Sequence, residues 1–299
     1  MAKRVGFIGL GLMGAPMAAN VAKAGFPLTV YNRSPGKADG LRAAGAAVAQ
    51  SPRELAGRSD VVITMLTDAA SVEEVVRGDE GLLAGGRPGS VLIDMSTISP
   101  DQSRSMAIEI GVRGWKKLEA PVFGSTGPAK DGTLGIMVGG DEALLEEHRD
   151  LLQAMGSRIF YMGRMGTGTV TKLAFNLMAA AQFQSLAEAM ALAAQGGVAT
   201  EKLGELIAVT PVISDLLQRK IANIVGDNYA PAFPLKHLHK DLGLMVETGH
   251  SLGVPLPSTG AIHETYTAAR SRGYADLDGI AVYCLLAEWS GSVERRKVP

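Results

Sequence analysis

Residues 165–197 read MGTGTVTKLAFNLMAAAQFQSLAEAMALAAQGG and form the longest run of helix-forming residues in the chain. After Gly168 neither proline nor glycine interrupts the run until its last two residues, and its alanine, leucine and methionine content suits close packing on several sides. Polar side chains inside the run argue against a membrane-spanning segment; they are Lys172, Asn176, Gln182, Gln184 and Glu188. The pattern predicts one long buried helix in a soluble core, and the rest of the sequence is arranged around it.

Two polar residues near the start of this helix, Lys172 and Asn176, are four positions apart, so their side chains lie on the same face. Burying them costs free energy unless a polar group meets them. One interpretation is structural: the lysine stem reaches toward water and the asparagine bonds a backbone group. The other is a proton-transferring lysine with an amide that orients it or a substrate, because partial desolvation shifts a lysine pKa toward neutrality. The helix alone leaves both interpretations open.

The composition limits the classes of protein to which the chain can belong. Its 299 residues, 46% of them apolar, suffice for two domains with separate cores, and a net charge of −1 gives no footprint for nucleic acid or an anionic membrane. The lone Cys284 excludes an internal disulfide, fits a reducing compartment and lies in an apolar run typical of a core. Because the start MAKRVGFIGLG lacks the features of a secretory signal, we expect a cytoplasmic protein with a solvated basic tail at 293–299.

Near the N-terminus, GLGLMG separates a predicted strand over 4–10 from a predicted helix over 13–24. In this pattern the first glycine permits a tight turn, the second lets a pyrophosphate approach the backbone, and the third lets helix and strand pack closely. The helix start then offers free N–H groups and a favourable dipole to phosphates. The alternative is a tight turn without a ligand. The predicted cofactor loop comprises Gly9, Leu10, Gly11, Leu12, Met13 and Gly14.

The end of the next predicted strand, over 27–31, bears on the choice of cofactor. Asn32, Arg33 and Ser34 follow it, where an NAD-selective site usually carries an acid that accepts from the ribose 2′-hydroxyl. Arg33 can instead pair with a 2′-phosphate, helped by the Ser34 hydroxyl. The alternative is an arginine that stacks on the adenine. The strand end therefore favours NADP(H).

Strands and helices continue to alternate through the first half, which predicts a parallel, doubly wound sheet. Further strands are predicted over 46–49, 61–66, 90–94 and 158–162, with helices over 35–44, 52–57, 70–77 and 142–155. Ligands lie at the carboxyl ends of such strands. The residues nominated there, each of which could equally be a turn residue, are Met65, Leu66, Thr67, Ser96 and Thr97.

A loop of small residues follows, in the segment LEAPVFGSTGPAKDGTLGIMVGGD at 118–141. Two short apolar strands flank residues 124–129, whose successive backbone N–H groups can form a concavity that receives a carboxylate. Gly124 and Ser125 are the candidate donors. The alternative is a plain hairpin-like loop.

After residue 163 the pattern becomes helical, with helices predicted over 199–209, 213–225, 235–251, 260–272 and 279–290. The fold class is therefore α/β: an N-terminal Rossmann-type doubly wound sheet (1–163), then an all-helical C-terminal domain (164–299), joined by a long interdomain helix. His237 and His239 diverge on a helix and lack a third ligand, so we predict no metal site. Lys240 and Asp241 form a solvated face in one interpretation, and in the other Lys240 reaches the cofactor.

Taken together, the sequence resembles the β-hydroxyacid dehydrogenase family, which includes 3-hydroxyisobutyrate dehydrogenases, tartronate semialdehyde reductases and glyoxylate/succinic semialdehyde reductases. The resemblance covers essentially the whole chain and rests on four segments: GFIGLGLMGAPMAAN (6–20), EAPVFGSTGPAKDGTL (119–134), GTGTVTKLAFN (166–176) and KDLGLM (240–245). The EAPV-GS form and the Asn-Arg-Ser strand end are most similar to the glyoxylate/succinic semialdehyde branch.

The resemblance implies roles for individual residues. Lys172 corresponds to the catalytic lysine and Asn176 to a substrate contact. Thr97 and Lys240 correspond to cofactor contacts, and Phe233 and Asp241 to parts of the interdomain site. The family also implies a homodimer or homotetramer that buries the helical domain.

One position departs from the family pattern: the substrate loop usually reads APVSG, and this chain has Phe123 at the serine position. A phenyl ring thus replaces a hydroxyl that meets the substrate carboxylate, while the loop backbone with Gly124 and Ser125 still offers donors. The change favours a more apolar pocket and a less polar carbonyl compound.

The resulting hypothesis is a reductase in which NADPH delivers hydride to the aldehyde carbon of glyoxylate, succinic semialdehyde or a similar small acid, and protonated Lys172 supplies the proton. A lysine near the reference pKa of about 10.4 is charged at neutral pH, which suits reduction. One alternative is NAD-dependent oxidation of the 3-hydroxyisobutyrate type, against which Arg33 argues. The others are imine reduction, motivated by Phe123, and a non-catalytic binding protein on the same fold, whose expected mark is loss of the helix lysine.

Overall fold

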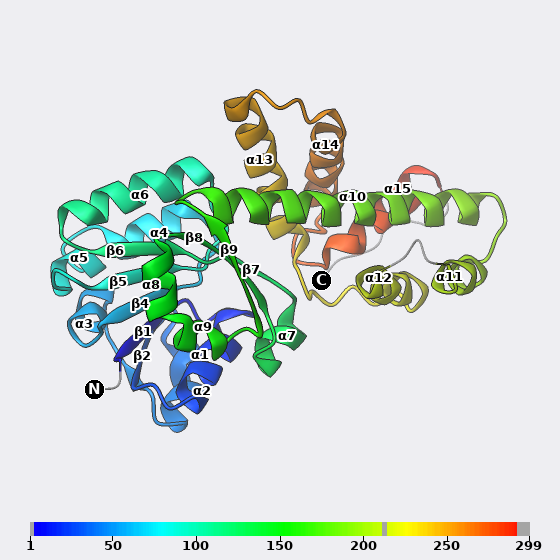
Figure 1. Ribbon diagram of the computed structural model, residues 1–299. Helices are drawn as coiled ribbons and strands as arrows, with labels where there is room; N and C mark the ends of the chain where they lie inside the picture. Colours follow the sequence, from blue (N-terminus) through cyan, green and yellow to red (C-terminus); the bar gives the residue numbers. More distant parts are fainter. Residues whose placement is uncertain (1–2, 211–213, 292–299) are drawn as a thin grey trace. The chain divides into compact units, whose positions relative to one another are not determined.

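The computed structural model describes residues 3–210 and 214–291 and contains two compact units, Met1–Lys172 and Leu173–Pro299 (Figure 1). The predicted fold class is confirmed: a Rossmann-like sheet domain is followed by a long helix and an all-helical domain. The predicted helix over 213–225 starts at a residue outside the described ones, as does the whole predicted tail at 293–299. The domain boundary at residue 163 stays a prediction.

The sheet of the first unit is parallel over most of its width. Its first six strands are β3 (Ala47–Val48), β2 (Leu28–Tyr31), β1 (Val5–Ile8), β4 (Val61–Thr64), β5 (Val91–Asp94) and β6 (Lys116–Glu119), in spatial order. The register pairs Ile8 with Tyr31 and with Thr64, Thr64 with Asp94, and Asp94 with Glu119. The carboxyl ends of five strands are therefore level, at the edge where such sheets bind ligands.

The parallel order changes after β6. Strand β8 (Gly135–Gly140) runs antiparallel to both β6 and the short β7 (Val122–Phe123), and β9 (Arg158–Gly163) pairs parallel with β8. Between β7 and β8 the chain forms a helix, α7 (Thr126–Asp131), and not a plain hairpin-like loop. Gly132, with φ of +68°, ends this helix in the left-handed conformation and turns the chain back into the sheet.

Helices cover both faces of this sheet, because alternate strand residues feed two separate cores. Val5, Phe7 and Ile63 lie in one core, and Ile8 and Val62 in the other. Helices contributing to the first core are α1 (Gly14–Lys23), α2 (Asp39–Ala43), α8 (Glu142–Glu147) and α9 (Arg149–Gln153), with the 3₁₀ turn η1 (Pro35–Ala38). The second core receives α3 (Pro52–Gly57), α4 (Ala69–Val76), α5 (Leu82–Gly85) and α6 (Pro100–Val112).

The sequence patterns had not predicted α5 or α6. Helix α6 is largely polar, so its apolar periodicity is weak. Its start nevertheless carries a capping box, in which Ser99 and Gln102 bond each other's backbone N–H groups. The Ser-Pro-x-Gln spacing is the sequence feature that could have predicted the start of α6.

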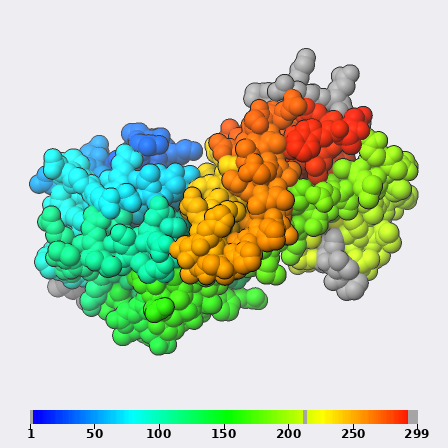
Figure 2. All heavy atoms as spheres, turned by 90° about the horizontal axis from the view of Figure 1, so that it is seen from above, coloured from blue at the N-terminus to red at the C-terminus, as the bar shows by residue number. Residues whose placement is uncertain are grey.

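The long helix α10 (Thr167–Gln195) leads from the first unit into the second. The second unit then contains α11 (Thr200–Ala208), α12 (Asp215–Val225), α13 (Leu235–Leu252), α14 (Pro257–Ser271), η2 (Gly279–Ala281) and α15 (Val282–Trp289). Helices α13 and α14 lie side by side and share one continuous surface, coloured yellow to orange in Figure 2. Cys284 of α15 is buried in the core, as predicted.

The prediction that α10 is buried on several sides is wrong for one of its faces. Phe183 and Met190 pack into the core of the second unit, but Phe175, Met178 and Leu192 are 42%, 61% and 76% exposed. The exposed residues recur at helical spacing, so they form an apolar stripe along one side. Composition gave no signal of this division, because alanine, leucine and methionine occur on both faces.

Candidate active site

The glycine loop between β1 and α1 has the geometry of a phosphate cradle. Gly9 has a φ of +97°, and a Cβ there would lie 2.3 Å from the carbonyl oxygen of Met65. A Cβ on Gly14 would lie 1.8 Å from the carbonyl oxygen of Gly9, so the turn and the helix start require glycine at both positions. A Cβ on Gly11 would meet nothing within 4 Å. Gly11 therefore leaves open space where the motif lets a pyrophosphate approach.

The start of α1 also suits an anion. Its N-cap residue, Met13, makes no side-chain capping hydrogen bond, and no acidic residue occurs in the first turn. N–H groups at a helix start that no side chain caps, together with the positive end of the helix dipole, favour a phosphate. This donor set fits a dinucleotide cofactor.

Asn32, at the end of β2, is tied to the glycine loop. Its Oδ1 accepts from the backbone N–H of Leu10 at 2.8 Å, and its Nδ2 donates to the carbonyl of Ser34 at 3.0 Å. Arg33 extends from the same turn into solvent and faces Glu74, with Nη1 3.7 Å from the carboxylate. Because both side chains of that pair are more than half exposed, their interaction is weak and leaves the guanidinium able to meet another anion.

The ends of β4 and β5 are joined by the side chains of Thr64, Asp94 and Ser96, of which the strand-end pattern predicts only Ser96. Asp94 Oδ1 accepts from the hydroxyl of Thr64 at 2.9 Å and from the backbone N–H of Ser96 at 3.1 Å. Ser96 Oγ in turn accepts from the backbone N–H of Leu66 at 3.0 Å. These bonds order the strand ends where Met65, Leu66 and the half-buried Thr97 lie.

Lys172 and Asn176 occupy the second and third turns of α10, one turn apart on the same face. The Lys172 side chain is half-buried, and Asn176 is buried. The chain immediately before them, at the helix start, bonds Glu119 of β6: Oε1 of that residue accepts from the N–H groups of Gly166 and Gly168.

Within the second unit, Asn176 and Lys240 both contact Asp241 of α13. Its Nδ2 donates to Oδ2 of Asp241 at 2.7 Å, and Lys240 Nζ lies 2.9 Å from Oδ1 of the same carboxylate. The lysine contact is an ion pair without hydrogen-bond geometry, since that buried oxygen has no hydrogen-bond partner. Asp241 is 2% exposed and thus connects an amide and a cation from two helices. The solvated-face alternative for Asp241 is wrong.

Phe123 lies against the sheet. Its ring covers Gly135 on the neighbouring strand, where an added Cβ would lie 2.0 Å from Cζ, and its centroid is 6.1 Å from that of Phe160 on β9. Gly124 follows with a φ of +113°, and Ser125 is the N-cap of α7 without a side-chain capping bond. The aromatic pair gives this end of the sheet an apolar surface.

Phe233, which precedes α13, is held by a residue that sequence reasoning missed. Asp278 is fully buried, and its Oδ2 accepts from the N–H groups of Ala232 and Phe233 at 3.1 and 3.3 Å. Its Oδ1 forms an ion pair of 2.5 Å with Lys220 of α12. Only folding brings residues so distant in sequence together, so no local pattern signalled this contact.

His237 and His239 show no arrangement for a metal. Oγ1 of Thr267 lies 2.9 Å from Nε2 of His239, and Arg270 lies 2.9 Å from its Nδ1, so both ring nitrogens are engaged. Over residues 3–210 and 214–291, no group of three or more His, Cys, Asp or Glu side chains is placed to ligate a metal ion. In the same part of the chain, no helix combines the length and apolar character needed to cross a membrane.

Comparison with known proteins places this architecture among oxidoreductases. Residues 4–163 match the NAD binding domain of 6-phosphogluconate dehydrogenase, and residues 166–286 match the NAD-binding domain of NADP-dependent 3-hydroxyisobutyrate dehydrogenase. The two matches together cover both units.

Individual relatives are similar in sequence to this chain over nearly its whole length. Glyoxylate/succinic semialdehyde reductase 1 of Arabidopsis thaliana is 36% identical over 93% of this chain and 96% of its own length. 2-(Hydroxymethyl)glutarate dehydrogenase of Eubacterium barkeri is 34% identical over 96% of both chains. The 3-hydroxyisobutyrate dehydrogenase of Mycobacterium tuberculosis, solved with L-serine, superposes with a TM-score of 0.85 at 32% identity, over 96% of this chain and 99% of its own.

Proposed function

The chain belongs to the β-hydroxyacid dehydrogenase family of NAD(P)-dependent oxidoreductases acting on CH–OH groups, and from this premise we propose that it reduces a small aldehyde acid with NADPH. Glyoxylate and succinic semialdehyde are the proposed substrates. The observation that carries the proposal is Lys172 in the second turn of α10, one turn before an asparagine that a buried aspartate holds in place.

Lys172 is the proposed proton donor. NADPH supplies the hydride when it is bound at the glycine loop. As the carbonyl oxygen gains negative charge, an ammonium group within hydrogen-bond reach stabilises it and then transfers a proton to it. Asn176, fixed by Asp241, presents its amide to the same substrate, and this orientation supplies part of the rate enhancement.

We assign the remaining predicted residues to two groups. Proposed cofactor contacts are Gly9, Leu10, Gly11, Leu12, Met13, Gly14, Asn32, Arg33, Ser34, Met65, Leu66, Thr97 and Lys240. Proposed substrate contacts are Thr97, Phe123, Gly124, Ser125, Asn176, Phe233 and Asp241.

The preference for NADPH over NADH rests on the turn after β2. Arg33 is 84% exposed in its side chain, its interaction with Glu74 is weak, and no carboxylate stands at residues 32–34 to accept from a ribose 2′-hydroxyl. A guanidinium there pairs with a 2′-phosphate through charge-assisted hydrogen bonds.

We also propose a homodimer or homotetramer in a reducing, cytoplasmic compartment. The apolar stripe on α10, with Met178 and Leu192 exposed, supports association of the helical unit. The lone, buried Cys284 supports a protein that needs no disulfide.

The test is the initial rate of NADPH and NADH oxidation with glyoxylate, succinic semialdehyde, tartronate semialdehyde and a cyclic imine. We expect turnover of an acid aldehyde with NADPH strongly preferred. Turnover of the imine alone would replace the substrate assignment, and a preference for NADH would remove the role given to Arg33. Absence of turnover with every compound would contradict the proposed reaction.

A further inference from the structure

Glu119, the last residue of β6, is buried at the start of α10 and meets only hydrogen-bond donors. Its Oε1 accepts from the backbone N–H groups of Gly166 (2.8 Å), Gly168 (2.7 Å) and Thr169 (3.2 Å). Its Oε2 accepts from the hydroxyl of Ser103 and lies 3.3 Å from the hydroxyl of Thr169. An ionised carboxylate offers about four acceptor positions and no donor, which suits a site lined by N–H and hydroxyl groups.

These contacts take the place of an ordinary N-terminal cap. The first N–H groups of a helix have no partner within it and are usually bonded by a side chain just before it. Here the capping carboxylate comes from a strand 47 residues earlier in the chain than Gly166. The close fit extends to the backbone, because a Cβ on Gly168 would lie 2.8 Å from the carbonyl of Met137 on β8. The helix start is therefore fixed to the sheet at one position.

Lys172 lies just beyond this anchor. It follows Thr169 by three residues, roughly 4.5 Å along the helix axis, and projects from the same side of the helix. A rotation or shift of the first turn therefore moves the lysine side chain directly. Misplacement of a reacting group by about 1 Å can reduce a rate by about 100-fold.

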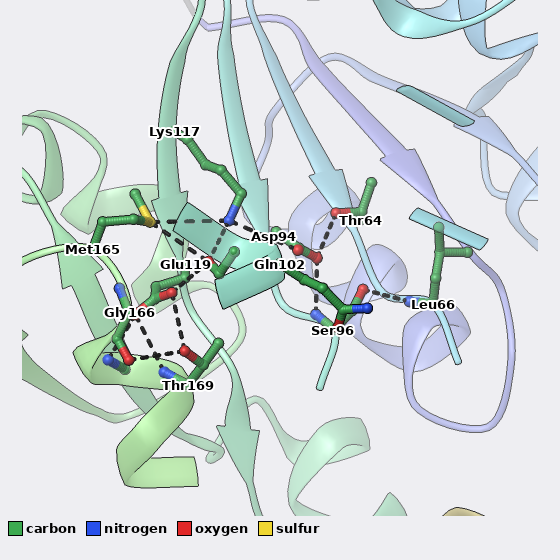
Figure 3. Close-up of polar contacts among 12 residues, drawn as sticks. Thr64, Leu66, Asp94, Ser96, Gln102, Lys117, Glu119, Met165, Gly166 and Thr169 are labelled. Atoms are coloured by element: carbon green, nitrogen blue, oxygen red, sulfur yellow. Dashed lines mark hydrogen bonds and ion pairs between the residues drawn. The ribbon is translucent and has the colours of Figure 1, made fainter. Parts of the chain in front are cut away.

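A buried lysine extends the anchor to the other strand ends (Figure 3). Lys117 Nζ donates to Ser103 Oγ at 2.8 Å and lies 3.9 Å from Oδ2 of Asp94, and its side chain is 1% exposed. Burial lowers the pKa of Lys117, and the negative charges of Asp94 and Glu119 oppose that shift. Lys117 therefore connects Asp94 with Ser103, whose hydroxyl donates to Glu119.

Asp94 leads from this lysine to the edge at which we place the cofactor. Its Oδ1 accepts from Thr64 and from the N–H of Ser96, and Ser96 bonds the N–H of Leu66. Figure 3 shows the continuous set of contacts from Leu66 to Thr169. The same buried polar network thus holds the ends of β4 and β5 at one side and the first turn of α10 at the other.

We infer that Glu119 is a positioning residue for hydride and proton transfer, because its network fixes the start of the Lys172 helix relative to the strand ends at the cofactor edge. This inference rests on the proposed function. Stability alone is a weak reason for such a network, since apolar replacements of buried ion pairs are often neutral or stabilising. A requirement for one geometry explains the buried charges directly.

The variant that tests this role is Glu119→Gln. Glutamine keeps the side-chain length, and its amide oxygen can still accept from the helix N–H groups, but its amide nitrogen adds a donor beside Ser103, which already accepts from Lys117. The matched control is Asp141→Asn, which makes the same chemical change in a carboxylate that caps α8 by accepting from Ala143 and Leu144.

The assay compares kcat, KM and the primary isotope effect on kcat, using NADPH deuterated at the transferred position. For E119Q we expect kcat to fall about 10- to 100-fold, NADPH affinity to stay within about twofold, and the isotope effect to rise as the chemical step becomes limiting. D141N should match the wild type. A lower kcat with unchanged KM and isotope effect would overturn the inference, because a partly unfolded preparation gives that result. A kcat within about twofold of wild type would also overturn it.

A second pair of measurements covers the case in which E119Q folds poorly. Ser103→Ala removes one support of Glu119 with little change in volume, and we expect a smaller fall in kcat, about 3- to 10-fold, again with a larger isotope effect. Hydrogen exchange at the amides of Gly166, Gly168 and Thr169 should accelerate in E119Q and not in D141N. Unchanged exchange would overturn the contact itself. If the wild type turned over no carbonyl compound, the proposed function would fail, and the exchange data alone would decide whether Glu119 holds the helix.

Discussion

Among residues 3–210 and 214–291, each unit buries one lysine near a carboxylate, and the two lysines are bonded differently. In the second unit, Lys220 forms a direct ion pair of 2.5 Å with Asp278 and lies 5.0 Å from the centre of the Phe183 ring. In the first unit, Lys117 has Ser103 at 2.8 Å and its nearest carboxylate, on Asp94, at 3.9 Å. The direct pair joins α12 to the segment around Phe233, and the indirect arrangement leaves Glu119 available for the start of α10.

This difference separates a contact that secures packing within its own unit from one that secures the start of the helix carrying Lys172, the proposed proton donor. Both oxygens of Asp278 accept from donors of its own unit. Oδ1 accepts from Lys220 and from the N–H of residue 280, and Oδ2 accepts from the N–H groups of residues 232 and 233. Glu119 accepts from the start of the helix that carries Lys172 and from Ser103 of α6. We therefore expect the first contact to affect stability most and the second to affect turnover most.

The largest effect on stability is expected for Lys220→Met. Breaking a buried pair by removing one partner costs about 3–5 kcal/mol, because the remaining charge is left without compensation. Denaturant unfolding followed by tryptophan fluorescence measures the loss, and Trp289 reports the second unit once Trp115 is replaced by Phe. A loss below about 1 kcal/mol would remove the distinction between the two lysines.

The same substitution in the first unit, Lys117→Met, should cost less. Desolvation already lowers the pKa of this lysine, and Asp94 and Glu119 keep their hydroxyl and N–H donors without it. We expect a loss of about 1–2 kcal/mol, read from Trp115 in a Trp289→Phe background, together with a fall in kcat of about tenfold. A K117M variant that lost stability but kept full turnover would show that the first network also serves packing alone.

A smaller change in the stability of the second unit is expected at acid pH. Burial, followed by the neighbouring charges of His263 and Arg270, lowers the pKa of His239 to about 4. Between pH 6.5 and 4 the unfolded chain therefore binds a proton that the folded chain does not, so stability is full above pH 6.5 and falls as the pH approaches 4. His239→Gln should flatten this part of the Trp289 unfolding profile. An unchanged slope would exclude His239 as its source.

Local patterns predicted the parts of the molecule that depend on neighbours in sequence. The glycines of residues 9–14, the alternation of strands with helices and the length of α10 were all readable, because turns and helices have local rules. The pairing of β8 antiparallel to β6 and the Glu119 contact to Gly166 depend on packing between distant segments. The segment EAPVFG is readable as a motif, but no local pattern indicates that its first residue, Glu119, bonds the start of α10.

The exposed face of α10 is a second feature that the sequence does not predict. Phe183 and Met178 are equally compatible with a long apolar helix, yet one is 3% and the other 61% exposed. Which face is covered depends on where α12, α13 and α15 pack, and no property of the helix itself decides it. The paired residues Asn176 and Asp241 were both nominated from sequence, but their hydrogen bond required the second unit to fold.

The most direct test of the account is the turnover of Lys172→Ala with NADPH and the acid aldehyde that the wild type reduces best, with NADPH binding measured on the same preparation. Lys202→Ala, at an exposed position on α11, is the matched control. For K172A we expect kcat to fall at least about 100-fold, with NADPH affinity within about twofold of wild type, and for K202A we expect no change. Turnover of K172A close to that of the wild type would contradict the proposed role of Lys172, since a proton donor cannot be removed without slowing the reaction that it serves.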